Sequence, residues 1–290
     1  MNPSIYEPLP PDMLQADRLA VAEACAVPSD VAMALLKPLS ARAWGDALFP
    51  QVAANDAHAA RLLAQLGADL VGLRNDRPGI YGELSRTRIF RSRAAALLDR
   101  HPRATGVNLG AGLGHYFQWL DRGANTWIDA DRPAVHALRQ RLLPSHPTGR
   151  RLNVACDLSV AGWWQRLGLP SGPYEPPLVL LFDAVELNLQ PTQMQAVLRE
   201  IGECATPGTR LLVDAPSRWA ARRTRGPMAQ PLHWTPSTLQ ALTAAHPRLR
   251  LDATHLVMAS YGWPYRILET AHQMVFGRPF HAVAELGVDA

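Results

Sequence analysis

Short apolar runs alternate with amphipathic segments over the last two thirds of the chain. The apolar runs have the length of buried strands, and the segments between them place apolar residues three or four positions apart, as helices do. Strands are predicted at Thr105–Leu109, Thr126–Ala130, Arg151–Ala155, Leu178–Phe182, Arg210–Asp214, Leu249–Met258 and His272–Phe276. Helices are predicted at Leu113–Leu120, Ala134–Leu143, Gly162–Leu167, Pro191–Ala205 and Pro236–Ala245. Regular alternation of strand and helix predicts an open, mostly parallel α/β sheet with right-handed crossovers.

The end and the front of the chain depart from this alternation. No helical pattern is evident between the last two predicted strands, which favours an antiparallel hairpin that closes the sheet. Residues 12–100 carry helical periodicity, with runs at Ala59–Leu73 and Leu84–Asp99, and the proline-rich stretch Met1–Pro11 is predicted to be an extended arm. We therefore expect a helical lid or substrate region at residues 1–103 and an α/β domain at residues 104–290.

Composition bounds the class of protein. The chain has 290 residues, of which 48% are hydrophobic and 19% charged, as in ordinary globular proteins. No apolar stretch is long enough for a membrane span and the first residues lack the features of a signal peptide, so the expected location is the cytoplasm, with no membrane partner. The three cysteines, Cys25, Cys156 and Cys204, form neither a disulfide framework nor a metal-binding motif. A formal charge of +4 is modest and argues against nucleic acid as a partner.

The segment Asn108–Gly114 carries the main indication of function. It follows a predicted strand, precedes a predicted helix, and places Gly110, Gly112 and Gly114 at alternate positions, with Ala111 between the first two. Glycine allows a tight turn with positive φ and lets the backbone approach a ligand at the helix start. The dinucleotide fingerprint needs Gly or Ala at position 115, where His115 stands, so the spacing argues against NAD.

The next predicted strand ends in two acids, Asp129 and Asp131, about 20 residues beyond the glycines. This is where doubly wound folds hold ribose hydroxyls, and ligands of such sheets bind at the carboxyl ends of the strands. Asp131 and Asp129 are both candidates for that contact.

With these motifs in order, residues 82–216 resemble one branch of the class I S-adenosylmethionine-dependent methyltransferases, the leucine carboxyl methyltransferase and tetracenomycin-type polyketide O-methyltransferase family. The resemblance is carried by the blocks Arg86–Arg88, Val107–Leu113, Asp129–Pro133, Asp157–Leu158 and Asp183–Pro191. It implies a Rossmann-like methyltransferase sheet, S-adenosyl-L-methionine as the cofactor and S-adenosyl-L-homocysteine as its product.

The resemblance also implies roles for single residues. Arg86 would bind the methionine carboxylate, and Asp131, or Asp129, the ribose. Asp157 and Leu158 would flank the adenine, and Asp183 would face the methionine portion near the methyl group. Arg86 also fits a helix-surface arginine, because Arg88, Arg91 and Arg93 crowd the same stretch.

Two departures from the family lie where an acceptor should sit. The family usually has Asp-Thr-Arg where this chain has Gly114, His115 and Tyr116, and often has Tyr where this chain has Asn188. His115, Tyr116, Glu186 and Asn188 are therefore the candidates to face the substrate, and His115 and Glu186 are the candidate bases. No catalytic residue is assigned and no metal is expected.

The sequence thus predicts a methyltransferase for a small-molecule acceptor of secondary metabolism. Oxygen, as carboxylate or hydroxyl, is the expected acceptor atom. S- or N-methylation of a metabolite, RNA or protein methylation through the arginines around Trp219, and a non-catalytic cofactor-binding protein remain alternatives. Tyr6, Trp44 and Tyr81 are candidates to line the acceptor pocket, and the aromatic turn Tyr261–Tyr265 is a further candidate. Neither the acceptor nor the oligomeric state follows from the sequence.

Overall fold

The structure is a computed structural model of the chain. It describes residues 29–66, 76–143, 146, 148–185, 189–223 and 233–290. The predicted arm at Met1–Pro11, Cys25, Glu186 and Asn188 lie outside the described residues.

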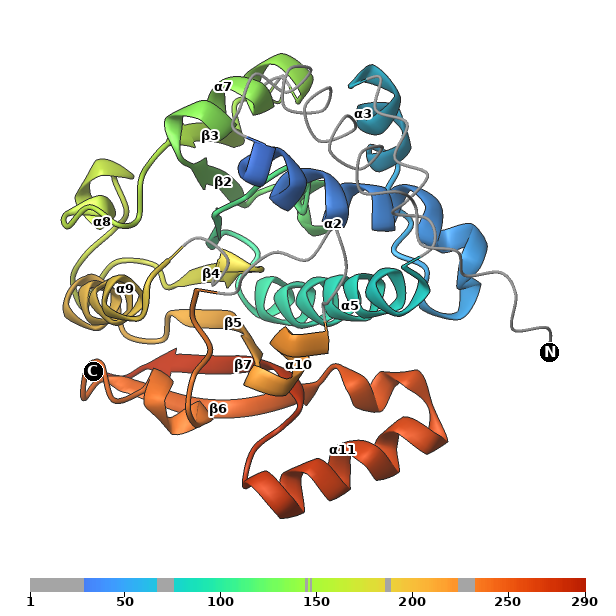
Figure 1. Cartoon of the computed structure of the whole chain (residues 1–290). Helices are drawn as coiled ribbons and strands as arrows, with labels where there is room; N and C mark the ends of the chain where they lie inside the picture. Colours follow the sequence, from blue (N-terminus) through green and yellow to red (C-terminus); the bar gives the residue numbers. More distant parts are fainter. Residues whose placement is uncertain (1–28, 67–75, 144–145, 147, 186–188, 224–232) are drawn as a thin grey trace.

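A seven-stranded sheet forms the centre of the molecule, in the order β3-β2-β1-β4-β5-β7-β6 (Figure 1). Its first five strands are parallel and confirm the predicted positions within two residues at either end. They are β1 (Thr105–Leu109), β2 (Thr126–Asp131), β3 (Arg151–Ala155), β4 (Leu178–Phe182) and β5 (Arg210–Pro216). Their carboxyl ends share one edge of the sheet, where the predicted site residues gather.

The last part of the sheet corrects the sequence prediction. Strand β6 (Leu249–Leu256) lies where a strand is expected, but the predicted strand at His272–Phe276 is wrong: these residues form the end of helix α11 (Trp263–Phe276). Pro264 in the first turn and Gly277 at φ 65° bound this helix, so the short apolar run at its end belongs to a helical face. The last strand is β7 (His281–Val288), which pairs antiparallel with both β5 and β6. The antiparallel closure is confirmed, although η4 (Met258–Tyr261) and α11 separate its two strands.

The crossover helices are shorter than the sequence suggests at two places. The predicted helix at Leu113–Leu120 is limited to α6 (Phe117–Leu120), and the one at Pro236–Ala245 to the 3₁₀ helix η3 (Leu239–Leu242). The others are α7 (Pro133–Leu142), α8 (Trp163–Arg166), α9 (Pro191–Cys204) and α10 (Arg218–Arg223). Proline occupies the first turn of α7 and α9, where its missing N–H costs no hydrogen bond.

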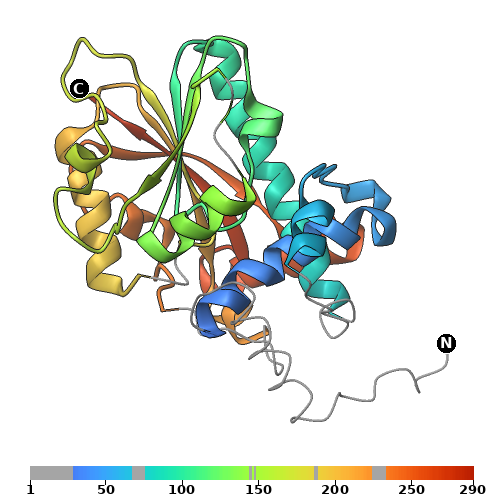
Figure 2. The ribbon, with the colours of Figure 1, turned by 90° about the horizontal axis from the view of Figure 1, so that it is seen from above.

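Strand alternation divides the core into two layers. In β4, Leu178, Leu180 and Phe182 pack toward α8 and α9, whereas Val179 and Leu181 pack toward Phe90 and other residues of α5 (Arg77–Arg100). Figure 2 accordingly shows α9 and α5 on opposite sides of the sheet. All five β4 side chains are buried, as expected of a central parallel strand.

The front section consists of α2 (Ser29–Leu48), η1 (Pro50–Val52), α3 (Ala59–Gln65) and α5. Apolar residues of α2 and α3 pack against Leu113 and against Val135, Leu138 and Leu142 of α7. This arrangement lays α2 across the carboxyl edge of the sheet, beside the loop that follows β1 (Figure 1).

Candidate functional site

The loop after β1 adopts the tight turn expected from its glycines. Gly110 has φ 65° and Gly112 has φ 51°, a region in which other residues are strained. A Cβ on Gly110 would lie 3.1 Å from Cγ2 of Val185, in the loop after β4. The N–H of Ala111 donates to the carbonyl of Ala130 (3.1 Å), which ties the turn to the end of β2.

A buried arginine of α7 supports this glycine loop from behind. Nη1 of Arg139 donates to the carbonyls of Gly112 (2.6 Å) and Gly114 (2.8 Å), and its Nη2 pairs with Asp129 (2.6 Å). Asp129 also pairs with Nε of Arg151 at 2.9 Å. Burial acts to raise the pKa of Asp129, but the two arginines hold it below its ordinary value. Asp129 therefore belongs to the scaffold of the loop.

Asp131 has a different position from Asp129. Its carboxylate accepts from the N–H of Gly112 (2.8 Å) and of Arg132 (2.7 Å), and it lines a narrow slot of about 60 Å³. Burial raises the pKa of Asp131 despite these hydrogen bonds. Of the two candidates for a ribose contact, Asp131 is the one that lines the slot.

Helix α2 forms the other wall of this slot. Leu35 lies so close that a Cβ on Gly112 would be 3.4 Å from its Cδ2, and Val31, Ala34 and Pro38 also line the slot. The slot is thus the space between the glycine loop and α2, and its width depends on where α2 lies.

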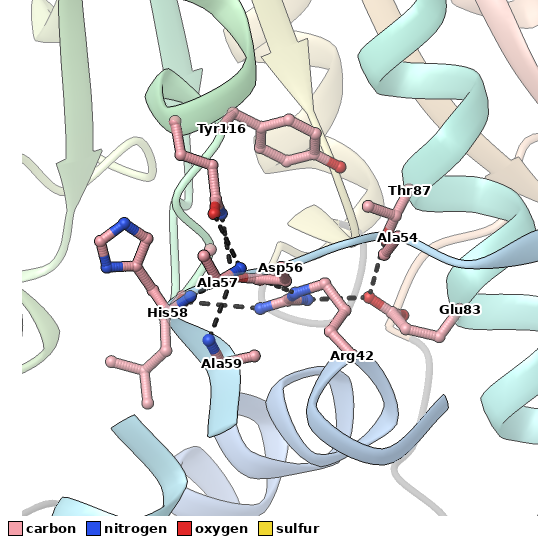
Figure 3. A network of polar contacts seen from close by, with 12 residues as sticks. Arg42, Ala54, Asp56, Ala57, His58, Ala59, Glu83, Thr87 and Tyr116 are labelled. Carbon is pink, nitrogen blue, oxygen red and sulfur yellow. Dashed lines mark hydrogen bonds and ion pairs between the residues drawn. The ribbon is translucent and has the colours of Figure 1, made fainter. Parts of the chain in front are cut away.

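A buried ion-pair network fixes α2 in this position (Figure 3). Arg42 of α2 pairs through Nε with Asp56 (2.9 Å) and through Nη1 with Glu83 of α5 (3.1 Å), and its Nη2 donates to the carbonyl of Leu113 (3.5 Å). Burial opposes the charge on Arg42, but Asp56 and Glu83 raise its pKa above the ordinary value. One arginine thus connects α2, α5, the loop before α3 and the glycine loop.

Arg86 of α5 lies among three carboxylates. Its Nη2 pairs with Glu83 (2.6 Å), its Nε with Asp183 at the end of β4 (2.7 Å), and its Nη1 with Asp214 of β5 (3.2 Å). Burial raises the pKa of Asp183 even though Arg86 opposes the shift, and the hydroxyl of Tyr116 donates to it at 2.7 Å.

A larger cavity of about 650 Å³, here called the main cavity, adjoins the slot. The two share Arg86, Ala184 and two residues of α2 as lining. Ala184 has φ 61°, and such strain in a residue without glycine's freedom is typical of functional sites. The aromatic lining of the main cavity comprises Phe49, Tyr81, Tyr261, Tyr265 and Phe280.

The main cavity also contains a histidine paired with an acid. Nε2 of His281, the first residue of β7, lies 2.6 Å from Oδ1 of Asp214. The sequence prediction did not include His281, because this residue follows the segment His272–Phe276 that was predicted as the last strand. Asp214 ends a correctly predicted strand at the carboxyl edge, so its position could have marked it as a candidate.

Most of the predicted site residues line the slot, but some of them do not. The slot is lined by Arg86, Gly110, Ala111, Gly112, Gly114, Tyr116, Asp131 and Asp183. His115 lines neither space: it is buried beside the ring of His58 (centroids 4.4 Å apart). Asp157 accepts from the N–H (2.9 Å) and hydroxyl (2.7 Å) of Ser159, and Leu158 packs in the core, so neither lines the slot.

The described residues contain neither a metal-binding cluster nor a membrane-spanning helix. No group of three His, Cys, Asp or Glu side chains there is arranged to hold a metal ion. Within the same ranges no helix has the length and apolar character needed to cross a membrane.

No protein-family model matches the sequence, and no curated protein matches it. Among solved structures, the chain is similar to a provisionally assigned methyltransferase from Thermobifida fusca YX, with 14% identity over 86% of this chain and 94% of that one and a TM-score of 0.54. It is also similar to the mitomycin 7-O-methyltransferase MmcR, with 17% identity, 95% and 75% coverage and a TM-score of 0.45. A third is the N-methyltransferase NodS from Bradyrhizobium japonicum WM9, with 14% identity, 71% and 97% coverage and a TM-score of 0.43. The first similarity confirms the fold class: the chain has the α/β Rossmann-like fold of methyltransferases.

Proposed function

We propose that this protein is an S-adenosylmethionine-dependent methyltransferase that acts on a small molecule. The observation that carries the proposal is the junction of two spaces at Arg86 and Ala184, one beside a glycine loop and one with the 650 Å³ volume of a small-molecule site. Support also comes from the sequence resemblance to the leucine carboxyl and polyketide O-methyltransferase family.

The chemistry of the slot suits the proposed cofactor. The Asp131 carboxylate would accept from ribose hydroxyls, as charge-assisted bonds favour. Arg86 would bind the methionine carboxylate. The resemblance assigns Asp157 and Leu158 to the adenine; they follow β3 and do not line the slot. Asp129 would contribute to cofactor binding indirectly, because it pairs with the arginine that supports the glycine loop. When bound, S-adenosylmethionine supplies a methyl group on a positively charged sulfur and leaves as S-adenosylhomocysteine.

The charges around Arg86 also favour a cationic methyl donor. Glu83, Asp183 and Asp214 surround the Arg86 guanidinium, with Arg42 as a second partner of Glu83, and burial has excluded most of the water that would screen these charges. Electrostatic interactions are stronger in such a setting than in water. A ligand with a sulfonium and an ammonium group would balance the excess of negative charge, and of these three acids Asp183 lines the slot.

The front section would act as a lid. Because α2 narrows the slot to about 60 Å³, entry of the cofactor requires α2 to move away from Gly112. The Arg42 network would re-form over the bound cofactor and exclude water, a common gating arrangement in enzymes. Residues 1–103 would thus be the lid and residues 104–290 the methyltransferase domain.

The acceptor would occupy the main cavity. Its volume and aromatic lining suit a small organic molecule, and we expect oxygen as the methylated atom, in a reaction of secondary metabolism. The aligned binding of two reactants is worth roughly 7–11 kcal/mol in favourable cases, so positioning would supply most of the catalysis.

A thermal-shift experiment tests the cofactor. S-adenosylhomocysteine at 100 times its dissociation constant should stabilise the protein by about 2.7 kcal/mol, and NADH should not. Asp131→Ala should weaken binding by on the order of 10- to 150-fold, the equivalent of about 1.5–3 kcal/mol for hydrogen bonds to a charged group. Asp99→Ala, which removes an exposed acid paired with Arg122, is the matched control and should bind normally. Stabilisation by NADH and not by S-adenosylhomocysteine would overturn the proposal.

A further inference from the structure

His281 reaches the functional edge of the sheet through antiparallel pairing. In the register of β5 and β7, His281 lies opposite Pro216 and Val283 opposite Asp214. The start of β7 therefore lies beside the carboxyl end of β5, and the side chain of His281 lines the main cavity. No other described histidine lines that cavity.

The pair of His281 and Asp214 has the geometry of an oriented base. The Asp214 side chain is fully buried, whereas that of His281 is 18% exposed. Nε2 lies 2.6 Å from a carboxylate oxygen, and an ionised carboxylate can only accept, so we assign the Nε2 proton to this contact and the role of proton acceptor to Nδ1. A carboxylate that fixes the tautomer of histidine and stabilises its charged form is the arrangement found in enzymes that use histidine as a base.

The rest of the cavity indicates what such a base would act on. The rings of Tyr81 and Tyr261 lie 4.3 Å apart and those of Tyr261 and Tyr265 5.2 Å apart, so they form one continuous aromatic wall. Aromatic surfaces bind planar rings through stacked or edge-to-face contacts. His281, Asp214 and Arg86 are among the polar groups that line the same cavity.

We propose that the main cavity binds an aromatic compound with a hydroxyl group and that His281 is the general base that removes the hydroxyl proton. This inference rests on the proposed function. A carboxylate acceptor, with a pKa near about 4, is already ionised at neutral pH and needs no base, whereas a phenol with a pKa near about 10 does. The presence of an oriented histidine therefore favours the hydroxyl over the carboxylate as the acceptor.

The acceptor O–H bond breaks and its proton passes to Nδ1 of His281, while the oxygen forms a bond to the methyl carbon. The bond between that carbon and the sulfur breaks, and its electron pair stays on sulfur, which becomes neutral. His281 is then an imidazolium beside Asp214 and returns its proton to water.

Several charged or titratable groups line the cavity together with His281 or lie next to it. They come from every element around this end of the cavity and are Glu83 and Arg86 of α5, Asp214 of β5, Tyr261 of η4, and Tyr265 and Glu269 of α11. Glu269 accepts from the N–H of Phe280 at 2.8 Å, directly before His281.

The first test needs no methyl donor. We would titrate the protein with 4-nitrophenol at a slightly acidic pH, where the free phenol is mostly protonated, and follow the absorbance of the phenolate. The wild type should increase the phenolate fraction of the bound compound, and His281→Gln should lose that increase. His255→Gln is the matched control, since His255 also pairs with a carboxylate (Glu285, 3.1 Å) but does not line the cavity. Failure of 4-nitrophenol to bind, or equal ionisation in His281→Gln, would overturn the inference.

The second test measures transfer of a labelled methyl group to 4-nitrophenol and to 4-nitrobenzoate, which differ in the acceptor group. The phenol should be methylated, and His281→Gln should lower its rate at a slightly acidic pH by roughly 10-fold, because the small ionised fraction of 4-nitrophenol still reacts without a base. The rate of the variant should recover as rising pH ionises the phenol, which a structural role would not produce. Transfer to 4-nitrobenzoate with no effect of His281→Gln would reject the hydroxyl acceptor.

Thermal shift with S-adenosylhomocysteine separates the two proposals. If His281→Gln retains that shift but loses phenol ionisation, both proposals stand. If neither the wild type nor His281→Gln is stabilised by S-adenosylhomocysteine but phenol ionisation still depends on His281, the assignment of the base is correct and the proposed cofactor is wrong.

Discussion

The slot and the main cavity meet at Arg86 and Ala184 but are built in different ways. The slot is formed by the loop after β1, the end of β2 and the wall of α2, and its floor is held by the ion pairs of Arg139, Asp129 and Arg151. The main cavity draws its lining from α2, α5, the ends of β5 and β7, and the segments around η4 and α11.

This difference separates two kinds of structural requirement. The slot depends on backbone geometry, so its glycines are fixed by φ and by close approach. The main cavity depends on side chains brought together from distant parts of the chain, which a different set of residues could line equally well. We therefore expect variants of the slot scaffold to affect folding and cofactor binding, and variants of the cavity to affect the acceptor step.

The largest expected effect is that of Arg139→Leu. Removing this guanidinium leaves the carbonyls of Gly112 and Gly114 without their donor and deprives buried Asp129 of one of its two arginines. Breaking a buried ion pair costs about 3–5 kcal/mol, so the free energy of unfolding should fall by that amount in denaturant titrations. The response to S-adenosylhomocysteine should also be lost.

Arg122→Ala serves as the control for Arg139→Leu. Its partner Asp99 is 62% exposed in its side chain, and surface pairs of this kind contribute about 0–1 kcal/mol. If Arg139→Leu retained full stability and cofactor binding, the slot would not depend on the buried scaffold, and the contrast between the two regions would fail.

The sequence was sufficient for the features that depend on local geometry. Strand alternation placed the first five strands, and the glycine spacing placed the turn that forms the slot. It also gave Asp131 as the candidate for the ribose contact, with Asp129 as the close alternative because both acids follow the same strand. Only the packing distinguishes them, since Asp129 is engaged by Arg139 and Arg151 whereas Asp131 lines the slot.

The main cavity could not be assembled in the same way. Its histidine starts a strand that was displaced along the chain, because the apolar end of α11 resembled a strand. Of the aromatic candidates, Tyr81, Tyr261 and Tyr265 line the cavity, whereas Trp44 packs against the apolar cluster of α2 and α3 and Tyr6 lies outside the described residues. The sequence could not place the three tyrosines beside Asp214 and His281 without the antiparallel register of β7. Arg42 was missed for a similar reason, because its partners Asp56 and Glu83 lie on separate segments.

An intermediate effect on stability is expected for His115→Gln. This variant allows His115, which lies beside the glycine loop, to be compared with His281 of the main cavity. Burial, followed by Arg151, lowers the pKa of His115 to about 3. A folded-state pKa below the unfolded value near about 6.5 means that the unfolded chain binds the proton first, so stability is lost as pH falls from that value toward 3. The free energy of unfolding of the wild type should therefore fall by up to about 1.4 kcal/mol per pH unit more than that of the variant in this range.

The same variant distinguishes His115 from His281 in function. Because His115 lines neither the slot nor the main cavity, His115→Gln should ionise bound 4-nitrophenol as the wild type does. Loss of ionisation in His115→Gln but not in His281→Gln would reverse the assignment of the base and restore the prediction made from the sequence.

The smallest expected effect is at Ala184, where the two regions meet. At φ 61° an alanine is strained by about 1–2 kcal/mol, whereas glycine is not, although glycine loses more backbone entropy on folding. Ala184→Gly should therefore leave the free energy of unfolding unchanged or raise it by up to about 1 kcal/mol. Asn55→Gly is the matched control, since Asn55 also has positive φ (52°) but lies outside both spaces.

The same pair of variants tests whether Ala184 has a role in catalysis. If Ala184 holds the acceptor against the methyl donor, Ala184→Gly should lower kcat for 4-nitrophenol while the dissociation constant of S-adenosylhomocysteine stays the same. Asn55→Gly should change neither quantity. An equal loss in both variants would mean that the effect comes from stability and that the boundary between slot and cavity has no role of its own.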